Sequence, residues 1–267
     1  MHRCRCPRIR VKLARFRIAQ IVIFRISMQA QPDNIYRTAP TELLLARELA
    51  ALDPLLAGIY GRHGLYIRPQ YLPEVAEPAH LLGNLITLHI DTPYRLAGAL
   101  NCAPSQLPFA SDSFKLIVIQ HAAENIAEPA LFSAELARVL APEGVALILG
   151  FNPYSAWRPW LALQQRRLPG SALRLQSPHL WETQLAQHDI DVMQRRYLGA
   201  FLPRASAVAQ APDDSARSLR WLSGLRGAYL LLARKRRSAL TPLRLRKASR
   251  ERAQAPHLVP GARRARP

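Results

Sequence analysis

Two almost uninterrupted apolar runs, separated by one amphipathic segment, constrain the fold of this chain more than any other feature. The runs Phe114–Gln120 and Val145–Phe151 are typical of strands buried on both faces of a parallel sheet. Between them, Pro129–Leu140 has apolar residues at helical spacing and predicts a helix with one buried stripe. Pro142-Glu143-Gly144 predicts a turn before the second strand. The segment therefore predicts a parallel β-α-β unit with a right-handed crossover.

Further elements on both sides of this unit predict a Rossmann-like α/β domain, with helices on both faces of a mostly parallel sheet. The additional strands are expected at His63–Arg68, Leu85–Asp91, Ile190–Tyr197 and Ala228–Ala233. The additional helices are expected at Leu43–Leu56, Tyr154–Leu168 and Pro178–His188, and residues 203–218 are expected to form a loop. We place the domain at residues 41–237, between a disordered basic leader, 1–40, and a disordered basic tail, 238–267.

The net charge of +19 is concentrated at the two ends of the chain. Residues 1–27 contain eight basic side chains and no acidic one, and residues 234–267 contain twelve basic side chains and one acidic one. Residues 28–233 are neutral, with 17 charges of each sign. Basic tails can attract phosphate by releasing counterions, so weak contact with nucleic acid is expected of the tails, and solvated ends are the alternative.

The remaining composition favours a cytoplasmic chain without a metal site. Its three cysteines have no zinc-binding spacing and indicate a reduced compartment. The longest uncharged run of the leader, Ile18–Phe24, has seven residues, far fewer than the ~20 that a membrane span needs. Because Met28 follows, residues 1–27 are either an extension upstream of the true start or a basic organelle-targeting leader.

An ordered series of short motifs occupies residues 107–150. It consists of Leu107-Pro108-Phe109, Asp112-x-Phe114, His121, Glu124, Arg138-Val139-Leu140 and Pro142-x-Gly144. This series resembles the methyltransferase type 11 family of class I S-adenosylmethionine-dependent methyltransferases. Tyr60-Gly61-Arg62-His63, Phe151-Asn152-Pro153 and Ala233-Arg234-Lys235 are similar to a smaller group of bacterial methyltransferase-like proteins. The resemblance implies the class I methyltransferase fold and methyl transfer from S-adenosylmethionine.

The resemblance also implies a cofactor site at the carboxyl ends of the strands. Asp91 would hold the ribose hydroxyls, and His121 would lie where cofactor and substrate meet. The segment at Leu107 would lie near the adenine, with Asn101 or Gln106 as its polar group.

The substrate pocket implied by the resemblance is formed by Glu124, Asn152 and Tyr154. Structural interpretations remain open beside this one. His121 can end its strand while Glu124 begins a helix, and Asn152 can hold a tight turn. Trp157 and Trp160 either belong to a lid over an apolar substrate or pack a helix onto the sheet.

Two positions differ from the family pattern. After the first strand no glycine occurs before Gly83, although the family has a glycine-rich loop on which the cofactor lies. Ala103 stands where the family usually has an aspartate. Three functions therefore remain: a methyltransferase with a small-molecule acceptor, which the resemblance favours; a catalytically inactive methyltransferase-like binding protein; and an RNA-binding or RNA-methylating protein that uses its basic tails.

Overall fold

The computed structural model describes residues 34–70, 77–168, 173–210 and 222–236. The chain divides into two compact units, Met1–Arg237 and Ser238–Pro267, and all described residues belong to the first. Most of the basic leader and the whole basic tail, for which nucleic-acid contact is expected, lie outside the described residues. Within the described ranges, no helix is both long enough and apolar enough to cross a membrane.

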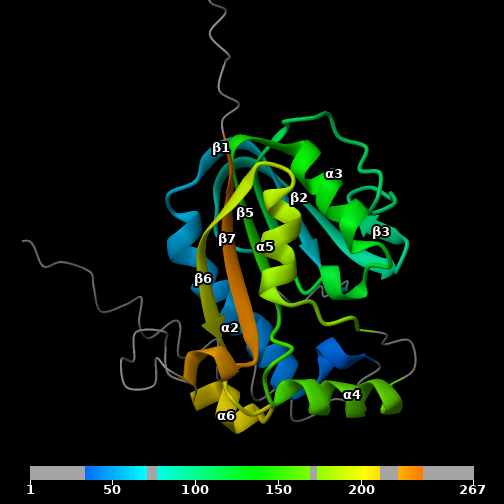
Figure 1. Cartoon of the computed structure of the whole chain (residues 1–267), viewed down its shortest axis with the longest axis vertical. Helices are drawn as coiled ribbons and strands as arrows, with labels where there is room; N and C mark the ends of the chain where they lie inside the picture. Colours follow the sequence, from blue (N-terminus) through cyan, green and yellow to red (C-terminus); the bar gives the residue numbers. More distant parts are fainter. Residues whose placement is uncertain (1–33, 71–76, 169–172, 211–221, 237–267) are drawn as a thin grey trace, which may run out of the picture. The chain divides into compact units, whose positions relative to one another are not determined.

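A seven-stranded sheet forms the centre of the first unit, in the order β3-β2-β1-β4-β5-β7-β6 (Figure 1). Its strands are β1 (Tyr60–Arg68), β2 (Leu81–Thr92), β3 (Arg95–Gly98), β4 (Phe114–Gln120), β5 (Leu140–Phe151), β6 (Ile190–Leu198) and β7 (Ala228–Lys235). β1, β2, β4 and β5 pair in parallel, and β7 is antiparallel to both β5 and β6. Only β3 and β7 oppose the common direction, which confirms the expected mostly parallel, Rossmann-like sheet.

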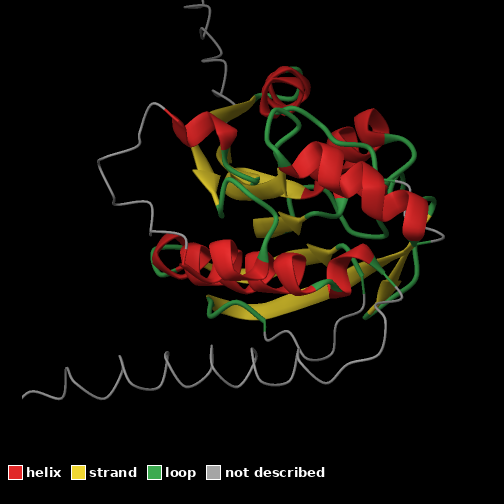
Figure 2. Cartoon of the chain, turned by 90° about the horizontal axis from the view of Figure 1, so that it is seen from below, coloured by secondary structure: helices red, strands yellow, loops and turns green. Residues whose placement is uncertain are grey.

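Helices pack against the sheet and form two apolar clusters with it, and Figure 2 shows them around the strands. The helical elements are η1 (Ile35–Arg37), α2 (Ala39–Leu56), η2 (Ala123–Asn125), α3 (Pro129–Val139), α4 (Trp157–Arg167), α5 (Pro178–Ala186) and α6 (Ala205–Gln210). One cluster contains buried residues of α3 and α5, and the other contains buried residues of η1, α2 and α4. The strands alternate their side chains between the two clusters, as a sheet buried on both faces requires.

The expected turn at Pro142-Glu143-Gly144 lies within a strand, because β5 already begins at Leu140. Glu143 has a left-handed backbone with φ of 59°, and the pairing with β4 shifts between Phe114 and Leu116. The turn-forming residues thus produce an irregularity inside the strand instead of ending it, as a bulge does.

The described residues include helical structure on the N-terminal side of residue 41, where we placed the start of the domain. Ile35 and Tyr36 of η1 are buried, and α2 begins at Ala39. Pro40 suits the first helical turn, where no N–H partner is needed, and the hydroxyl of Thr41 donates to the carbonyl of Ile35 instead of capping the helix. The sequence did not predict the burial of Ile35 and Tyr36, because polar residues stand on either side of this short apolar pair.

The loop expected over residues 203–218 is wrong at its beginning, where α6 forms. Alanine occupies every second position from Ala205 to Ala209, and alanine has the highest helix propensity of all residues. Residues 211–218 lie outside the described part of the chain.

Gly150 of β5 provides the space for one of the largest buried side chains. It stands opposite Tyr229 of β7, which is buried in the cluster below α3 and α5. A Cβ atom added at Gly150 would lie 2.5 Å from the hydroxyl oxygen of Tyr229 and 2.7 Å from its Cζ atom. The ring cannot move aside without displacing its buried neighbours, because interiors are closely packed.

We expect Gly150→Ala to lower the free energy of unfolding by about 1–3 kcal/mol, because it overpacks the core. Urea unfolding followed by circular dichroism measures the change. Gly58→Ala is the matched control: a Cβ at Gly58 meets no atom within 4 Å, and its stability should remain within about 1 kcal/mol of the parent. Equal stability of the two variants would contradict the packing argument.

Candidate functional site

The point at which strand order reverses lies between β1 and β4. The chain proceeds from β1 outward to β2, and later returns to place β4 on the other side of β1. In open α/β sheets, ligands bind beyond the carboxyl ends of the strands at such a reversal. Here those ends carry Tyr66 and Arg68 on β1 and Gln120 on β4, which is followed directly by His121.

His121 is held between two carboxylates at this point. Its Nδ1 atom lies 3.0 Å from Glu124 of η2, and its Nε2 atom lies 2.9 Å from Glu48 of α2. The side chains of His121 and Glu48 are 0% exposed, and that of Glu124 is 1% exposed. A ring with a carboxylate at each nitrogen can donate from both only as the imidazolium.

The electrostatic balance around His121 favours its charged form. Burial alone would lower the pKa of His121, but the attraction of Glu48 and Glu124 and the hydrogen bonds that the ring donates to both outweigh it and raise the pKa to about 10. His121 also has a left-handed backbone with φ of 48°, which few non-glycine residues adopt. The surrounding bonds must therefore hold this conformation in place.

A chain of buried hydrogen bonds extends from this cluster in two directions. Toward β1, Gln120 donates to Glu48 over 3.0 Å and accepts from the Tyr66 hydroxyl over 2.5 Å. Toward β5, Glu124 accepts from the backbone N–H of Phe151. The carboxyl ends of β1, β4 and β5 are thus connected to α2 through one network of polar side chains.

The carbonyl of His121 anchors η1 to the same place. It accepts from the hydroxyl of Tyr36 over 3.2 Å and from the amide of Asn125 over 2.9 Å, and the same amide also donates to the Tyr36 hydroxyl over 2.7 Å. η1 is therefore part of the site.

Asp91 lies on the same edge of the sheet, at the carboxyl end of β2. Its side chain is 46% exposed and lies 3.6 Å from the guanidinium of Arg95. The carboxylate can therefore be reached by a ligand, and a polar ligand group can compete for it with this surface ion pair.

The three residues that the resemblance places near the adenine of the cofactor differ in their surroundings. Asn101 and Gln106 are exposed in the loop between β3 and β4. Leu107 is buried, and its backbone is occupied: its N–H donates to Glu135 over 2.9 Å and its carbonyl accepts from Arg138 over 2.8 Å. Both partners belong to α3, so the Leu-Pro-Phe and Arg-Val-Leu motifs hold each other.

The three residues implied for the substrate pocket do not share one environment. Glu124 is enclosed with His121, and Tyr154 is 68% exposed. Asn152 is buried and holds a loop, since its amide donates to the carbonyls of Gly224 and Arg226 over 2.7 and 2.9 Å. This geometry agrees with the structural interpretation of Asn152, in which its side chain holds a turn.

Loops at the carboxyl edge meet at the carbonyl of Ala200. That oxygen accepts from the indole N–H of Trp157 over 3.0 Å and from the backbone N–H of Gly227 over 3.1 Å. Trp157 is fully buried, whereas Trp160 is half-buried beside it. Trp157 therefore packs α4 onto the rest of the unit and does not form a movable lid.

A cavity of about 250 Å³ opens beside the carboxyl end of β1. It is lined by Arg68, Gln70, Glu77, Thr87, His89, Gly98 and Ala99. Thr87 and His89 stand beside Tyr66 and Arg68 in the parallel register of β1 and β2. The hollow therefore lies on one face of these two strands, next to the reversal point.

The residues present fit the ribose end of S-adenosylmethionine better than its methionine end. Asp91 offers an accessible carboxylate that can accept from two hydroxyls. At the end of β1, the side chains of Arg68 and Pro69 are buried, and no glycine brings the backbone close to a ligand. The His121 cluster next to them is closed to solvent.

Sequence reasoning did not identify Glu48 or Tyr36 as members of the site. Glu48 offered a signal, because it is a carboxylate between Leu44 and Leu52 on the stripe of α2 that is buried. A charge on an apolar stripe needs a partner, and an unpaired histidine at a strand end was available.

The fold and this edge have the Rossmann-like, mostly parallel α/β arrangement that the sequence predicted. A protein family described as "Methyltransferase domain" matches residues 89–148, which contain Asp91, Leu107, His121 and Glu124. The resemblance inferred from the sequence motifs is thereby confirmed. No curated protein matches the chain.

Solved structures of methyltransferases are similar to the chain at low identity. A presumed methyltransferase of Bacillus halodurans is 15% identical with a TM-score of 0.47, over 71% of this chain and 99% of that one. An S-adenosylmethionine-dependent methyltransferase of Thermotoga maritima is 12% identical with a TM-score of 0.46, over 74% and 92% of the two chains. A phosphoethanolamine N-methyltransferase of Haemonchus contortus, in complex with S-adenosylhomocysteine, is 12% identical with a TM-score of 0.46, over 76% and 59%.

We expect Glu48→Gln to lower the free energy of unfolding by about 1–3 kcal/mol, because it replaces a charge-assisted hydrogen bond to a buried imidazolium with a neutral one. Urea unfolding measures the change. Glu128→Gln, at an exposed glutamate, is the control and should alter stability by less than about 0.5 kcal/mol. A Glu48→Gln variant as stable as this control would show that the pair contributes nothing.

The raised pKa of His121 predicts that stability decreases at alkaline pH. In the unfolded chain the ring titrates at about 6.5, so in the folded protein it retains its proton up to about pH 10. The folded state binds more protons over this range, so the stabilisation is complete below pH ~6.5 and is lost as the pH rises through about 10. Urea midpoints measured across this range should fall in the parent and change less in His121→Gln. Parallel curves would contradict the assignment.

Proposed function

We propose that the chain is an S-adenosylmethionine-dependent methyltransferase that acts on a small-molecule acceptor. The observation that carries the proposal is the position of Asp91. It lies inside the segment that matches the methyltransferase domain, at the carboxyl end of β2, with its side chain accessible. An acid at this place can accept hydrogen bonds from both hydroxyls of a ribose.

The other residues at this edge have supporting roles in the proposal. Exposed Asn101 and Gln106 can hydrogen-bond to an adenine that lies against the loop between β3 and β4. The bound cofactor would supply an electrophilic methyl group. Methyl transfer depends on alignment more than on a strong acid or base, so the rigid frame around His121 would serve by fixing the strand ends.

The second candidate is a methyltransferase-like protein that binds a ligand without catalysis. Two observations favour it: the end of β1 has no glycine that would admit the methionine part of the cofactor, and the His121 cluster fills the reversal point with buried side chains. Under this proposal, the edge would retain affinity for a nucleoside and lose the geometry for transfer.

Calorimetric titration of the full chain with S-adenosylmethionine, S-adenosylhomocysteine and adenosine distinguishes the two candidates. The methyltransferase is expected to bind S-adenosylmethionine and S-adenosylhomocysteine in the micromolar range. Asp91→Asn should weaken this binding roughly tenfold or more, because a ribose contact with a charged acceptor is lost. Asp53→Asn, on α2 away from this edge, is the matched control and should bind like the parent.

Each outcome of the titration has a distinct meaning. Equal affinity for adenosine and for the two ligands that carry an amino-acid moiety would favour the binding protein. No heat and no thermal shift with any of the three ligands would contradict both candidates. Unchanged binding in Asp91→Asn would move the cofactor site away from β2.

A further inference from the structure

Part of the carboxyl edge of the sheet is positively charged, although residues 28–233 as a whole are neutral. We define the rim as residues 150–168, 173–177, 199–207 and 222–227, which contain α4, the loops at Ala200 and Asn152, and the start of α6. These residues include six arginines and no acid. In the described residues as a whole, 18 basic side chains face 13 acidic ones, so the excess of positive charge lies entirely on the rim.

Most of the rim arginines are exposed to solvent. Five of them are exposed: Arg158, Arg166, Arg167, Arg174 and Arg204. The sixth, Arg226, is buried and lies 5.9 Å from the ring of Phe201. Glu128, an exposed acid, follows η2 beside the segment of Arg174, and it lies at the border of the rim.

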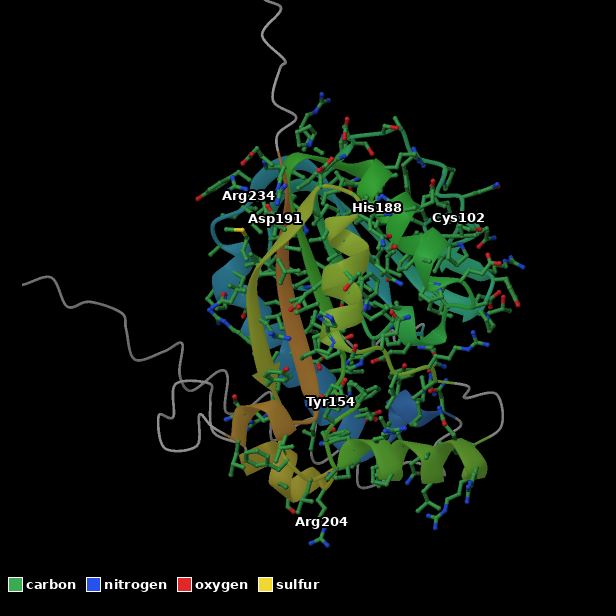
Figure 3. All side chains as sticks on the ribbon, viewed as in Figure 1. Cys102, Tyr154, His188, Asp191, Arg204 and Arg234 are labelled. Carbon is green, nitrogen blue, oxygen red and sulfur yellow. The ribbon has the colours of Figure 1, made fainter. Side chains whose placement is uncertain are left out.

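Large apolar side chains are exposed among these arginines. Tyr154, Leu163, Leu202 and Leu225 are each between 43% and 68% exposed. Figure 3 shows Tyr154 and Arg204 at the end of the sheet where α4 and α6 lie. The outward face of α4 itself combines Arg158, Leu163 and Arg166, while Trp157 and Leu161 hold its inward face in the core.

We propose that the rim docks on the surface of a bilayer that contains anionic phospholipids. Arginines attract the anionic headgroups, and the exposed leucines and Tyr154 can enter the boundary between headgroups and acyl chains, as in interfacial amphipathic helices. Aliphatic side chains favour lipid over RNA, because bases stack on aromatic rings and on arginine planes rather than on leucines. This inference does not depend on the proposed enzymatic activity.

Flotation of the full chain with vesicles tests the proposal. The probes are phosphatidylcholine vesicles and vesicles of phosphatidylcholine with phosphatidylglycerol, at about physiological ionic strength. Under these conditions, salt largely screens interactions between exposed charges that are more than about 8 Å apart. The chain should float with the mixed vesicles and not with phosphatidylcholine alone. The variant Leu163→Ser/Leu202→Ser should bind on the order of tenfold more weakly, because it removes apolar area that enters the bilayer.

The variant Arg158→Gln/Arg166→Gln should also bind roughly tenfold more weakly, because each arginine near an anionic surface contributes to binding. Two control variants separate the rim from the rest of the chain. Leu81→Ser/Leu131→Ser removes leucines of similar exposure outside the rim, and Arg263→Gln/Arg264→Gln removes the same charge from the basic tail. The leucine control should bind like the parent, and the tail control should lose less binding than the variant of the rim arginines.

The proposal is overturned if the rim leucines can be replaced without effect, or if the tail control loses as much binding as the rim arginines. It is also overturned if the chain ignores vesicles but binds a single-stranded RNA oligonucleotide through the rim arginines. Circular dichroism of each variant verifies that it is folded, which is expected because all substituted rim side chains are exposed.

Discussion

The fixed point of this structure is a protonated imidazole enclosed between two carboxylates. Glu48 reaches His121 from a helix that precedes the sheet, and Glu124 reaches it from the turn that follows β4. Removing three charges from water is costly, so the group is favourable only while all of its members are present and bonded. Because the partners come from distant parts of the sequence, the network helps to specify how α2 sits on the strands.

That arrangement determines what the carboxyl edge can offer a ligand. The centre of the edge, at β1 and β4, is filled by protein side chains, while the outer part at β2 and β3 keeps an accessible acid and a hollow. A cofactor bound here would rest on the outer strands and their loops. The closed centre lies beside the end of β1, where the sequence has no glycine-rich loop.

The sequence predicted the central β-α-β unit well, because its strands are buried on both faces and their patterns are governed by local hydrophobicity alone. The boundary of β4 is correct to the residue, and that of α3 differs by one. The sequence did not reveal Tyr36 or Glu48 as neighbours of His121, since a contact between residues 73 positions apart leaves no periodic trace. The sequence also predicted a neutral domain. A sum of charges along the chain cannot show that the rim contains arginines and no acid.

At the carbonyl of Ala200, the groups that hold the loops together are different from the side chains that face solvent. Trp157 and Gly227 bind that oxygen with groups that face inward, while the side chains of neighbouring positions such as Tyr154 and Leu202 face outward and bear no structural bond of this kind. Outward positions can therefore change over evolutionary time without loosening the scaffold beneath them. A family built on this frame could diversify in what its outer surface recognises while its interior remains almost constant.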